Sequence, residues 1–451
     1  MKREKPRKNR KLQKLQKQKH KLQFQRPSAV QTAFMMRCLQ KGAVVLILKP
    51  TDAQSAYNDL EVGIFFHFGI RTFNEENRDW DMKQMELSTF NPAQLDCEAW
   101  MQDVVRMGGR YTVMTTKHHD GFCLWRTKYS DYAVQNTPFK DGKGDVVREY
   151  CDACRKYGIK VGLYYSCAQF GSKDMDSKAY NDFVCGQLEE LLVNYGQIDI
   201  LWFDSCGSEN YDFDVARIQK TIYSLQPNVL VFGSWGKDIR WIGNEWGLSP
   251  MPNDNTVEGF YAPGECDCCI TRKEWENFWF YNETNRQYVR TPEELTALYL
   301  YSVGRGANLL VNIAPDRRGL LPADNVRLME EMKNEIRRRY TDCVLENDGF
   351  EHDEENHAYV LCFDRHYLVD TVILSEENAD GEKIRSFSVY ASQNNREKGI
   401  KVYSSDTVGR KHICSFPPVR ASRLTVMIED SDGKETLTAF TPCYHSGKQP
   451  Y

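Results

Sequence analysis

The sequence lacks an apolar run long enough to cross a bilayer. A membrane-spanning helix needs about 20 predominantly apolar residues, whereas the candidate segment at residues 43–48 contains six. A secretory signal would need about 7 to 15 apolar residues near the N-terminus and a small-residue cleavage site, and this segment is too short and comes too late. We therefore exclude a bilayer-spanning protein and expect a cytoplasmic one.

A disulfide framework is also lacking, although cysteine is abundant. The chain has fifteen cysteines, an odd number, and Cys123, Cys167 and Cys206 lie in apolar surroundings, which is typical of buried thiols in a reducing compartment. Two clusters could hold a metal, but neither has a partner cluster at zinc spacing, so we interpret them as structural thiols. These clusters are Cys151 with Cys154, and Cys266 with Cys268 and Cys269.

Negative charge is nearly missing from the first 26 residues, which contain twelve Lys or Arg and the single acid Glu4. The rest of the chain has 47 basic and 62 acidic residues, a net charge of −15, and such an acidic body argues against a broad nucleic-acid surface. The basic segment at residues 1–49 could tether the chain to nucleic acid or to an acidic surface. We favour a disordered extension, which could also be an upstream start that the working protein does not use.

Short β-rich runs alternate with helix-length amphipathic segments between residues 50 and 341, which predicts stacked βα units. The expected strands are Val62–Phe68, Tyr111–Thr116, Lys160–Tyr165, Ile198–Phe203, Val229–Phe232 and Asn308–Ile313. The expected helices are Leu95–Met107, Val146–Tyr157, Tyr180–Tyr195, Phe213–Leu225, Pro292–Val303 and Ala323–Arg339. Six such units indicate an α/β fold, a partly degenerate (β/α)8-like TIM barrel. Residues 241–290 show no clean periodicity, so we expect the remaining strands there.

Residues 342–451 contain no helical pattern. Their segments alternate in polarity or are rich in β-branched residues between turn residues, which predicts a small all-β sandwich domain. Acids, histidines and nucleophiles do not converge in it. We expect it to pack against the barrel, with sugar binding as the alternative.

Polar residues end the predicted barrel strands, where TIM barrels carry their active sites. They are His67; Lys117, His118, His119 and Asp120; Tyr164 and Tyr165; and Asp204. Each histidine alone could be a core residue, but three histidines, two tyrosines and an acid on one rim favour a site.

Two carboxylates are the main candidates for chemistry. Asp204 directly follows the apolar residues 200–203, although an Asx turn or a helix N-cap would also place an aspartate there. Glu245 lies between Trp241 and Trp246, in surroundings that would favour the protonated carboxyl group of a general acid; a surface glutamate is the alternative. One ionised and one protonated carboxyl group are the pair of catalytic groups that most glycoside hydrolases use.

Aromatic residues could supply stacking faces for a sugar, and histidines and tyrosines could bind its hydroxyls. The candidate tryptophans are Trp80, Trp125, Trp235 and Trp279. Metal-assisted hydrolysis is the main chemical alternative, since His67, His118 and His119 could ligate zinc. Adjacent residues on a strand point to opposite faces, so we do not expect His118 and His119 to reach one ion. We expect no metal and no organic cofactor.

Several linked motifs give the chain a resemblance to a known family. They are Gly-Ile-Phe-Phe-His-Phe-Gly at 63–69, Thr-Thr-Lys-His-His-Asp-Gly-Phe-Cys-Leu-Trp at 115–125, Gly-Leu-Tyr-Tyr-Ser at 162–166 and Ile-Asp-Ile-Leu-Trp-Phe-Asp at 198–204. From about residue 50 to the C-terminus the sequence resembles the retaining α-L-fucosidases of glycoside hydrolase family 29. The resemblance implies a hydrolase that removes terminal L-fucose from fucosylated glycans.

The resemblance also implies roles for individual residues. Asp204 falls on the family's nucleophile, and Glu245 falls on the acid/base residue of one branch. Residues 240–245, Arg-Trp-Ile-Gly-Asn-Glu, resemble that branch, whose members prefer α-1,3- and α-1,4-linked fucose as in Lewis-type glycans. The residues expected to bind substrate are His67, Trp80, His118, His119, Tyr165, Trp202, Arg240 and Trp279.

Three other hypotheses remain open. The enzyme could have a broader linkage specificity, or the chain could bind fucose without turnover, although the intact pair of Asp204 and Glu245 argues against that. The basic segment at residues 1–49 could instead associate the chain with RNA or ribosomes. We expect glycans, and no membrane, as partners.

Overall fold

The computed structural model describes residues 49–74, 83–168, 175–208, 211–250, 253–257, 260–272 and 279–447, and the structural statements below concern these residues. Our expectations for the basic N-terminal segment and for Trp80 fall outside them. The chain divides into two units, residues 1–47 and residues 48–451. The second unit contains the barrel and the β domain described next.

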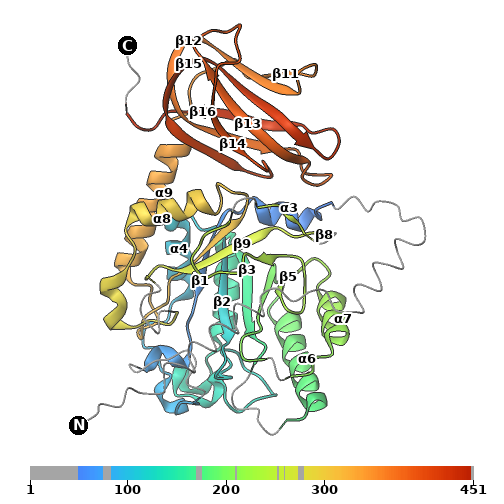
Figure 1. Cartoon of the computed structure of the whole chain (residues 1–451). Coiled ribbons are helices and arrows are strands. Elements are labelled where there is room, and N and C mark those ends of the chain that lie inside the picture. Colours follow the sequence, from blue (N-terminus) through green and yellow to red (C-terminus); the bar gives the residue numbers. More distant parts are fainter. Residues whose placement is uncertain are drawn as a thin grey trace, which may run out of the picture. The chain divides into compact units, whose positions relative to one another are not determined.

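Eight parallel strands form a nearly closed barrel, which confirms the predicted fold class (Figure 1). They are β1 Val62–Phe66, β2 Tyr111–Lys117, β3 Lys160–Ser166, β4 Ile200–Asp204, β5 Leu230–Gly233, β6 Arg240–Trp241, β9 Gly264–Cys269 and β10 Asn308–Asn312. Their order is β5-β4-β3-β2-β1-β10-β9-β6. A pairing between Phe232 and Ile239 connects β5 with the start of β6, so the two ends of the sheet meet.

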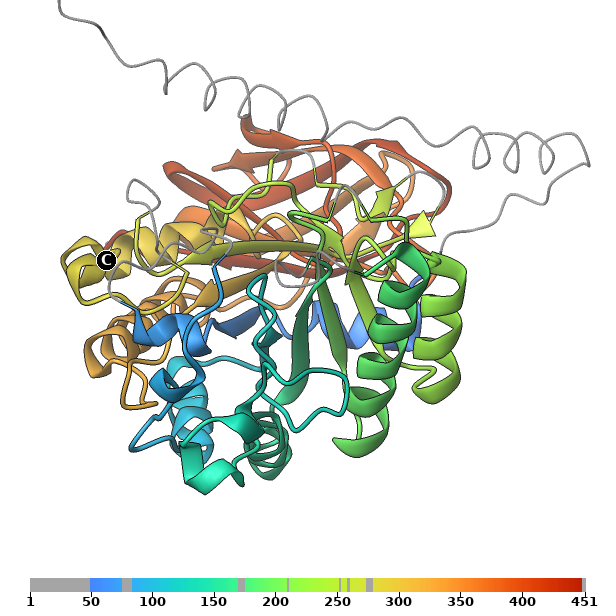
Figure 2. The same ribbon diagram turned by 90° about the horizontal axis from the view of Figure 1, so that it is seen from below.

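Helices α4 to α7 and α9 lie around the outside of these strands (Figures 1 and 2). The α-helices are α3 Asp52–Asn58, α4 Cys97–Met107, α5 Val146–Tyr157, α6 Ser177–Asn194, α7 Val215–Leu225, α8 Pro292–Tyr301 and α9 Ala323–Tyr340. Short 3-10 helices occur at Ile70–Phe73, Leu87–Thr89, Val134–Asn136, Phe139–Gly142 and Glu283–Tyr288. None of the helices in the described ranges is long and apolar enough to cross a membrane.

Aspartates fix the start of four of the outer helices. The side chains of Asp96, Asp145, Asp176 and Asp214 each accept a hydrogen bond from the backbone N–H three residues later. Such an N-cap satisfies one of the free N–H groups of the first turn and contributes about 1 kcal/mol. These caps therefore set where each loop that leaves the carboxyl end of a strand turns into a helix.

Aromatic side chains dominate the interior of the barrel. Tyr57 of α3 enters it and joins the inward-facing residues of the strands, so α3 contributes to the barrel core. The buried residues of this interior cluster are Tyr57, Phe65, Tyr111, Val113, Tyr164, Ile200, Trp202, Leu230, Phe232, Ile239 and Leu310. A second, larger core, which we call the outer core, is formed by the outward-facing side chains of the strands and the helices that cover them.

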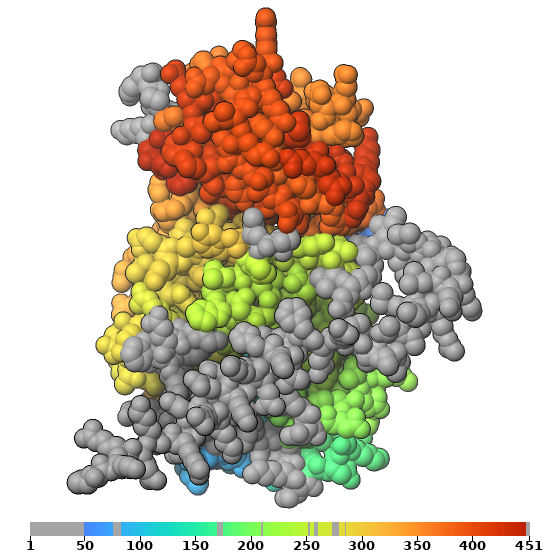
Figure 3. All heavy atoms as spheres, in the orientation of Figure 1, coloured from blue at the N-terminus to red at the C-terminus, as the bar shows by residue number. Residues whose placement is uncertain are grey.

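The C-terminal domain is all-β, as predicted, and its strand pairs are antiparallel. Its strands are β11 Glu351–Asp353, β12 Ala358–Glu376, β13 Ile384–Ser392, β14 Ile400–Ser405, β15 His412–Ser431 and β16 Leu437–Cys443. The order is β11-β12-β15-β13-β14, and β16 pairs with residues 371–376 of β12, on the edge that β11 also uses. The domain encloses its own apolar core, and its residues form one contiguous orange and red block in Figure 3.

Two further short strands form a separate hairpin, β7 Thr256–Val257 and β8 Phe260–Tyr261. They lie between β6 and β9, in the region where the sequence shows no periodicity. The loops of this region connect the last two strands of the barrel sheet.

Candidate active site

Polar side chains gather where the barrel strands end. Asp204 is the last residue of β4, His67 follows β1, and His118 and His119 follow β2. Glu245 lies in the segment after β6. Because all eight strands are parallel, their carboxyl ends meet at one edge of the barrel, and the contacts described next connect Asp204 with the histidines.

Asp204 is held by three groups. The Tyr164 hydroxyl donates a hydrogen bond to Oδ2 over 2.8 Å, and Nε2 of His119 lies 3.5 Å from the same oxygen. The backbone N–H of Cys206 donates to Oδ1 over 2.8 Å. The Asp204 side chain remains 25% exposed, so a fixed carboxylate faces open space beside a ring of buried aromatic groups.

The three histidines form one cluster. Ring centroids are 5.7 Å apart for His67 and His118 and 4.2 Å apart for His118 and His119. Nδ1 of His67 lies 2.9 Å from Oδ1 of Asn312, and Nδ1 of His119 lies 2.6 Å from Oγ of Ser166. These contacts fix two of the rings.

Burial keeps these imidazoles neutral. It lowers the pKa of His67 to about 3 and lowers the pKa of His118 and of His119 as well, and only for His119 does the Asp204 carboxylate oppose the effect. A neutral imidazole has one donor and one acceptor nitrogen, which suits the hydroxyl groups of a sugar. Nδ1 of His118 is buried and has no hydrogen-bond partner among the described residues.

His118 and His119 both belong to the histidine cluster. Our argument that they would not both reach one metal ion assumed that they lie on a strand, whereas β2 ends at Lys117 and both histidines lie in the loop that follows, where side chains need not alternate. Among the described residues no group of three or more His, Cys, Asp or Glu side chains is arranged to hold a metal ion. The geometry therefore gives the zinc alternative no support.

Aromatic rings cover the histidines. Trp279 lies 4.7 Å from His67 between ring centroids, and Phe280 lies 5.0 Å from His118. The side-chain amide of Asn312 donates to the backbone carbonyl of Trp279 over 2.7 Å and so anchors this aromatic segment to β10. Phe280 was not among the residues we predicted, although it is the neighbour of Trp279 in the sequence.

A buried carboxylate lies below the site and supports Trp202. Glu265 of β9 accepts hydrogen bonds from Nε1 of Trp202 over 2.8 Å and from the hydroxyls of Tyr57 and Tyr111 over 2.5 and 2.7 Å. Burial raises the pKa of Glu265, and the three donors oppose that effect. Trp202 in turn stacks on Phe232 at a centroid distance of 4.1 Å.

A second buried acid of β9 connects Glu245 to the barrel. Asp267 is 3% exposed and accepts a 2.7 Å hydrogen bond from Nε1 of Trp241. Its pKa is raised well above the usual value by burial and then by the negative charge of Glu245. Glu245 is therefore close enough to Asp267 for their charges to interact, on the side of β9 that faces the barrel interior.

We predicted Tyr165 as the tyrosine of the pocket, but in the structure its neighbour Tyr164 faces the pocket. The Tyr165 hydroxyl donates to Oε1 of Gln187 over 2.8 Å, and the ring lies in the outer core near Trp235. Side chains alternate along a strand, and β3 pairs Tyr164 with Trp202 of the interior. Tyr165 consequently points out of the barrel.

Arg240 also points away from the pocket. Its guanidinium donates to Oδ1 of Asn253 over 2.8 Å and to the carbonyl of Asp254 over 3.1 Å. Trp241, the next residue, is the partner of Glu265 in the sheet, so alternation turns Trp241 inward and Arg240 outward. Trp241, Asp267 and Glu265 were not predicted, because their inward orientation depends on the register between β6 and β9.

Two of the tryptophans that we considered as sugar-stacking faces lie elsewhere. Trp125 and Trp235 are buried in the outer core, and the Trp125 indole donates to Oε2 of Glu190 over 3.0 Å. Asp120 and Lys117 are buried as well: Asp120 pairs with Arg71 at 3.2 Å, and Nζ of Lys117 lies 4.0 Å from the ring centroid of Tyr165. These four residues support the site from outside it.

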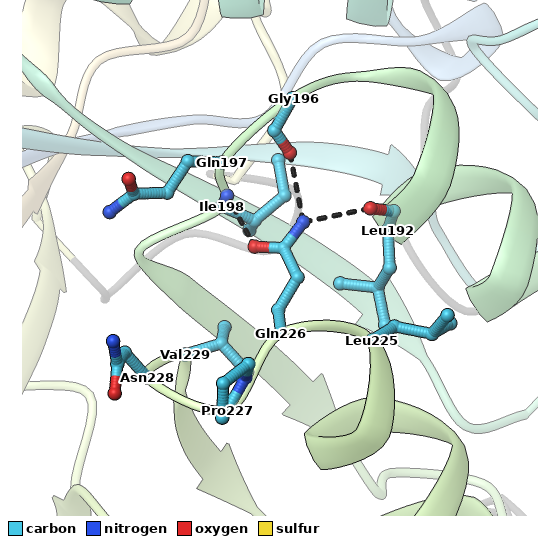
Figure 4. Close-up of a pocket in the computed structure, with 9 residues that line it drawn as sticks. All are labelled: Leu192, Gly196, Gln197, Ile198, Leu225, Gln226, Pro227, Asn228 and Val229. Carbon is cyan, nitrogen blue, oxygen red and sulfur yellow. Dashed lines mark hydrogen bonds between the residues drawn. The ribbon is translucent and has the colours of Figure 1, made fainter.

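A surface hollow of about 340 Å³ lies at the other edge of the barrel. It is formed where residues 196–198 lead into β4 and residues 227–229 lead into β5 (Figure 4). The side-chain amide of Gln226 lines it and makes hydrogen bonds with the backbone of Leu192, Gly196 and Ile198. No lining side chain can exchange a proton near neutral pH, so we locate the site by its chemistry and not by this hollow.

Comparison with known families gives a match that spans the barrel. The model of the α-L-fucosidase family matches residues 47–338. These residues include every strand of the barrel and all of the site residues described above.

Individual relatives agree with this match. Alpha-L-fucosidase 1 of Arabidopsis thaliana is 30% identical over 452 aligned positions, which cover 88% of this chain and 87% of the relative. A solved glycoside hydrolase family 29 member from an unknown rumen bacterium has a TM-score of 0.77 at 26% identity and covers 89% of this chain and 78% of its own. A Ruminococcus gnavus family 29 fucosidase in complex with fucose has a TM-score of 0.76 at 22% identity over 88% of this chain and 95% of its own, a likeness of fold.

Proposed function

Because this chain belongs to the α-L-fucosidase family of glycoside hydrolases, we propose that it removes terminal L-fucose from glycans with retention of configuration. The observation that carries the proposal is the environment of Asp204, a partly exposed carboxylate fixed by Tyr164 and Cys206 beside His119. Such a carboxylate has the orientation and the access that a nucleophile needs.

The mechanism we propose is a double displacement. Asp204 attacks the anomeric carbon and forms a covalent fucosyl ester, while Glu245 donates a proton to the departing glycosidic oxygen. Glu245 then removes a proton from water, which attacks the same carbon and releases fucose and the Asp204 carboxylate. Retaining enzymes of this kind hold the two carboxyl groups about 5 to 5.5 Å apart. Neither step uses a metal or an organic cofactor.

The histidine cluster is suited to hold the sugar. His67, His118 and His119 are neutral, and the ring of His118 contacts the rings of the other two, so we propose that the three histidines bind the ring hydroxyls. Trp279 and Phe280 cover them with apolar surface, and we assign to that surface the C6 methyl group, which distinguishes a 6-deoxy sugar.

We further propose that the substrates carry α-1,3- or α-1,4-linked fucose, as in Lewis-type glycans. The support is the sequence at residues 240–245, Arg-Trp-Ile-Gly-Asn-Glu. A broader linkage specificity is the alternative. Proton NMR of product formation from a Lewis-type trisaccharide and from 2'-fucosyllactose separates the two: we expect the first to be cleaved faster by at least an order of magnitude, and equal rates would favour the alternative.

Substitution of the two carboxylates tests the mechanism. We expect Asp204→Ala to lose several orders of magnitude in kcat while the protein stays folded. Glu245→Ala should lose much less on substrates with good leaving groups, which need no proton, and azide should restore part of its rate. A near-normal rate for Asp204→Ala would contradict the nucleophile assignment, and equal losses of Glu245→Ala on good and poor leaving groups would contradict the acid assignment.

A further inference from the structure

Trp241 points into the barrel although it is the last residue of a two-residue strand. It pairs in register with Glu265 of β9, whose carboxylate binds Trp202 and Tyr57 in the barrel interior. Register partners of neighbouring strands share a side of the sheet. The Trp241 indole accordingly reaches Asp267, two residues further along β9 on the same side, at 2.7 Å.

Its polar edge is fixed while part of the ring is open. Trp241 remains 37% exposed, whereas its hydrogen-bond acceptor Asp267 is 3% exposed. The other inward tryptophan of the sheet, Trp202, is 7% exposed. An indole with a satisfied N–H and an accessible apolar ring is a preformed contact surface, because binding to it costs little side-chain entropy.

The segment that carries Trp241 also carries Glu245, and β9 holds it at both ends. The backbone N–H of Ile242 donates to the carbonyl of Glu265 over 3.1 Å, and that of Gly247 donates to the carbonyl of Asp267 over 3.1 Å. The charge of Glu245 also acts on the Asp267 side chain. Trp241 and Glu245 are thus fixed to the same stretch of β9.

An acid that protonates a glycosidic oxygen must face the bond between fucose and the sugar that leaves. A fixed, open aromatic ring beside that acid therefore lies on the side of the leaving sugar. The C–H face of a pyranose ring is apolar, and aromatic rings in binding sites contact such surfaces.

We propose that Trp241 is the surface on which the leaving-group sugar stacks and that Asp267 is its positioning residue. The proposal rests on the proposed function, since it uses Glu245 as the acid. It names Trp241 as a residue that determines which fucosylated glycans are accepted, because a leaving group that presents no apolar ring face cannot use the contact.

Two substrates with different leaving groups test the role of Trp241. One is a fucosylated trisaccharide that the wild type cleaves, and the other is α-L-fucosyl fluoride, whose leaving group is a single atom. For Trp241→Ala we expect kcat/KM on the trisaccharide to fall about 10- to 100-fold, mainly through KM, as for a lost apolar pocket contact. The loss on the fluoride should be smaller by about tenfold or more, and Trp241→Phe should recover part of the trisaccharide activity.

Trp246 provides the matched control. It belongs to the same segment and is 53% exposed, but it pairs with Cys268, whose side chain lies in the outer core. Trp246→Ala should keep the wild-type KM for the trisaccharide, because Trp246 does not share the side of β9 on which Trp241 lies. Asp267→Asn retains an acceptor oxygen for the indole and should lose less on the trisaccharide than Asp267→Ala.

Three results would overturn the assignment of Trp241. Equal losses of Trp241→Ala on both substrates would indicate a structural role, and a loss on the trisaccharide that falls on kcat and leaves KM unchanged would indicate an effect on Glu245. Unchanged kinetics on both substrates would show that no sugar contacts the ring. Failure of the wild type to hydrolyse either substrate would instead overturn the proposed function, and the leaving-group site with it.

Discussion

At the scale of single residues, the hydrogen bond from Tyr164 to Asp204 is the contact that most directly orients the proposed nucleophile. It is 2.8 Å long and its donor is buried. A hydrogen bond to a charged group in such surroundings contributes about 1.5 to 3 kcal/mol. Part of that stabilisation holds the carboxylate in position for attack.

We expect Tyr164→Phe to lower kcat by about 10- to 100-fold, since removal of the hydroxyl costs about 1.5 to 3 kcal/mol. Tyr165→Phe is the matched control, because it removes a hydroxyl from the neighbouring residue that bonds Gln187 outside the barrel. It should keep kcat and lose about 1 kcal/mol of unfolding free energy. Steady-state kinetics and urea unfolding of both variants check this prediction. A larger loss of kcat in Tyr165→Phe than in Tyr164→Phe would mean that Tyr164 is not the residue that orients Asp204.

The same pair of residues shows how far the site can be predicted from sequence. The motifs place Asp204 and the three histidines at strand ends, and the structure brings His119 into contact with Asp204 and His118 into ring contact with His67 and His119. Tyr164 and Tyr165 cannot be separated in this way, because both are apolar neighbours in a buried strand. Which of them faces inward is decided by the pairing of Tyr164 with Trp202, which is a tertiary property.

At the scale of elements, the loop that carries Glu245 depends on a glycine in the left-handed region. Gly243 has a φ of +88°, and a Cβ added there would meet no atom within 4 Å. Gly158, which ends α5, has a φ of +69° and equally open surroundings. An L-residue in this region costs about 1 to 2 kcal/mol of strain whatever the space.

The two glycines therefore form a matched pair. We expect Gly158→Ala to lower the unfolding free energy by about 1 kcal/mol without a change in kcat, because it lies at a helix end away from the strand ends. Gly243→Ala should relieve the same strain by shifting the loop, which displaces Glu245 and lowers kcat at least tenfold on substrates with poor leaving groups. Thermal unfolding measurements and steady-state kinetics of both variants test this prediction. Unchanged kinetics in Gly243→Ala would mean that the loop conformation does not position Glu245.

Elements differ in how well the sequence predicts them. The helix at Val146–Tyr157 was predicted to the residue, because Asp145 caps its start and Gly158 its end. Strands β6 and β9 were expected only as unplaced strands within residues 241–290; β9 lies in that region, and β6 begins at Arg240. β6 is only two residues long, and β9 reads Gly-Glu-Cys-Asp-Cys-Cys, a sequence without β-branched residues whose acids face the interior because they serve the site.

At the scale of the whole molecule, His412 lies where the β domain meets the barrel. It is the bridge partner of Arg305, and the backbone N–H of Ile413 donates to the carbonyl of Gly304 over 2.9 Å. The ring bonds the Tyr403 hydroxyl at 2.9 Å. Burial, and to a smaller extent the charge of Arg305, lowers the pKa of His412 to about 4.

This histidine should make the domain junction sensitive to acid. Its folded-state pKa lies below the unfolded value of about 6.5, so its contribution to stability is complete above pH 6.5 and is lost as the pH falls to about 4. The loss amounts to roughly 3 kcal/mol. His412→Gln should flatten the decline of unfolding free energy between pH 6.5 and 4.5, relative to wild type and to the exposed control His366→Gln. If urea unfolding gave the same pH dependence of the unfolding free energy for all three proteins, the prediction would be contradicted.

The most direct test of the whole account is to trap the covalent intermediate. A 2-deoxy-2-fluoro-α-L-fucosyl fluoride has a good leaving group and a slow second step, so the ester should accumulate on the nucleophile. We expect peptide mapping by mass spectrometry to find one fluorofucosyl group on Asp204 of the wild type. A label on any other residue would contradict the central claim that Asp204 is the nucleophile of a retaining fucosidase.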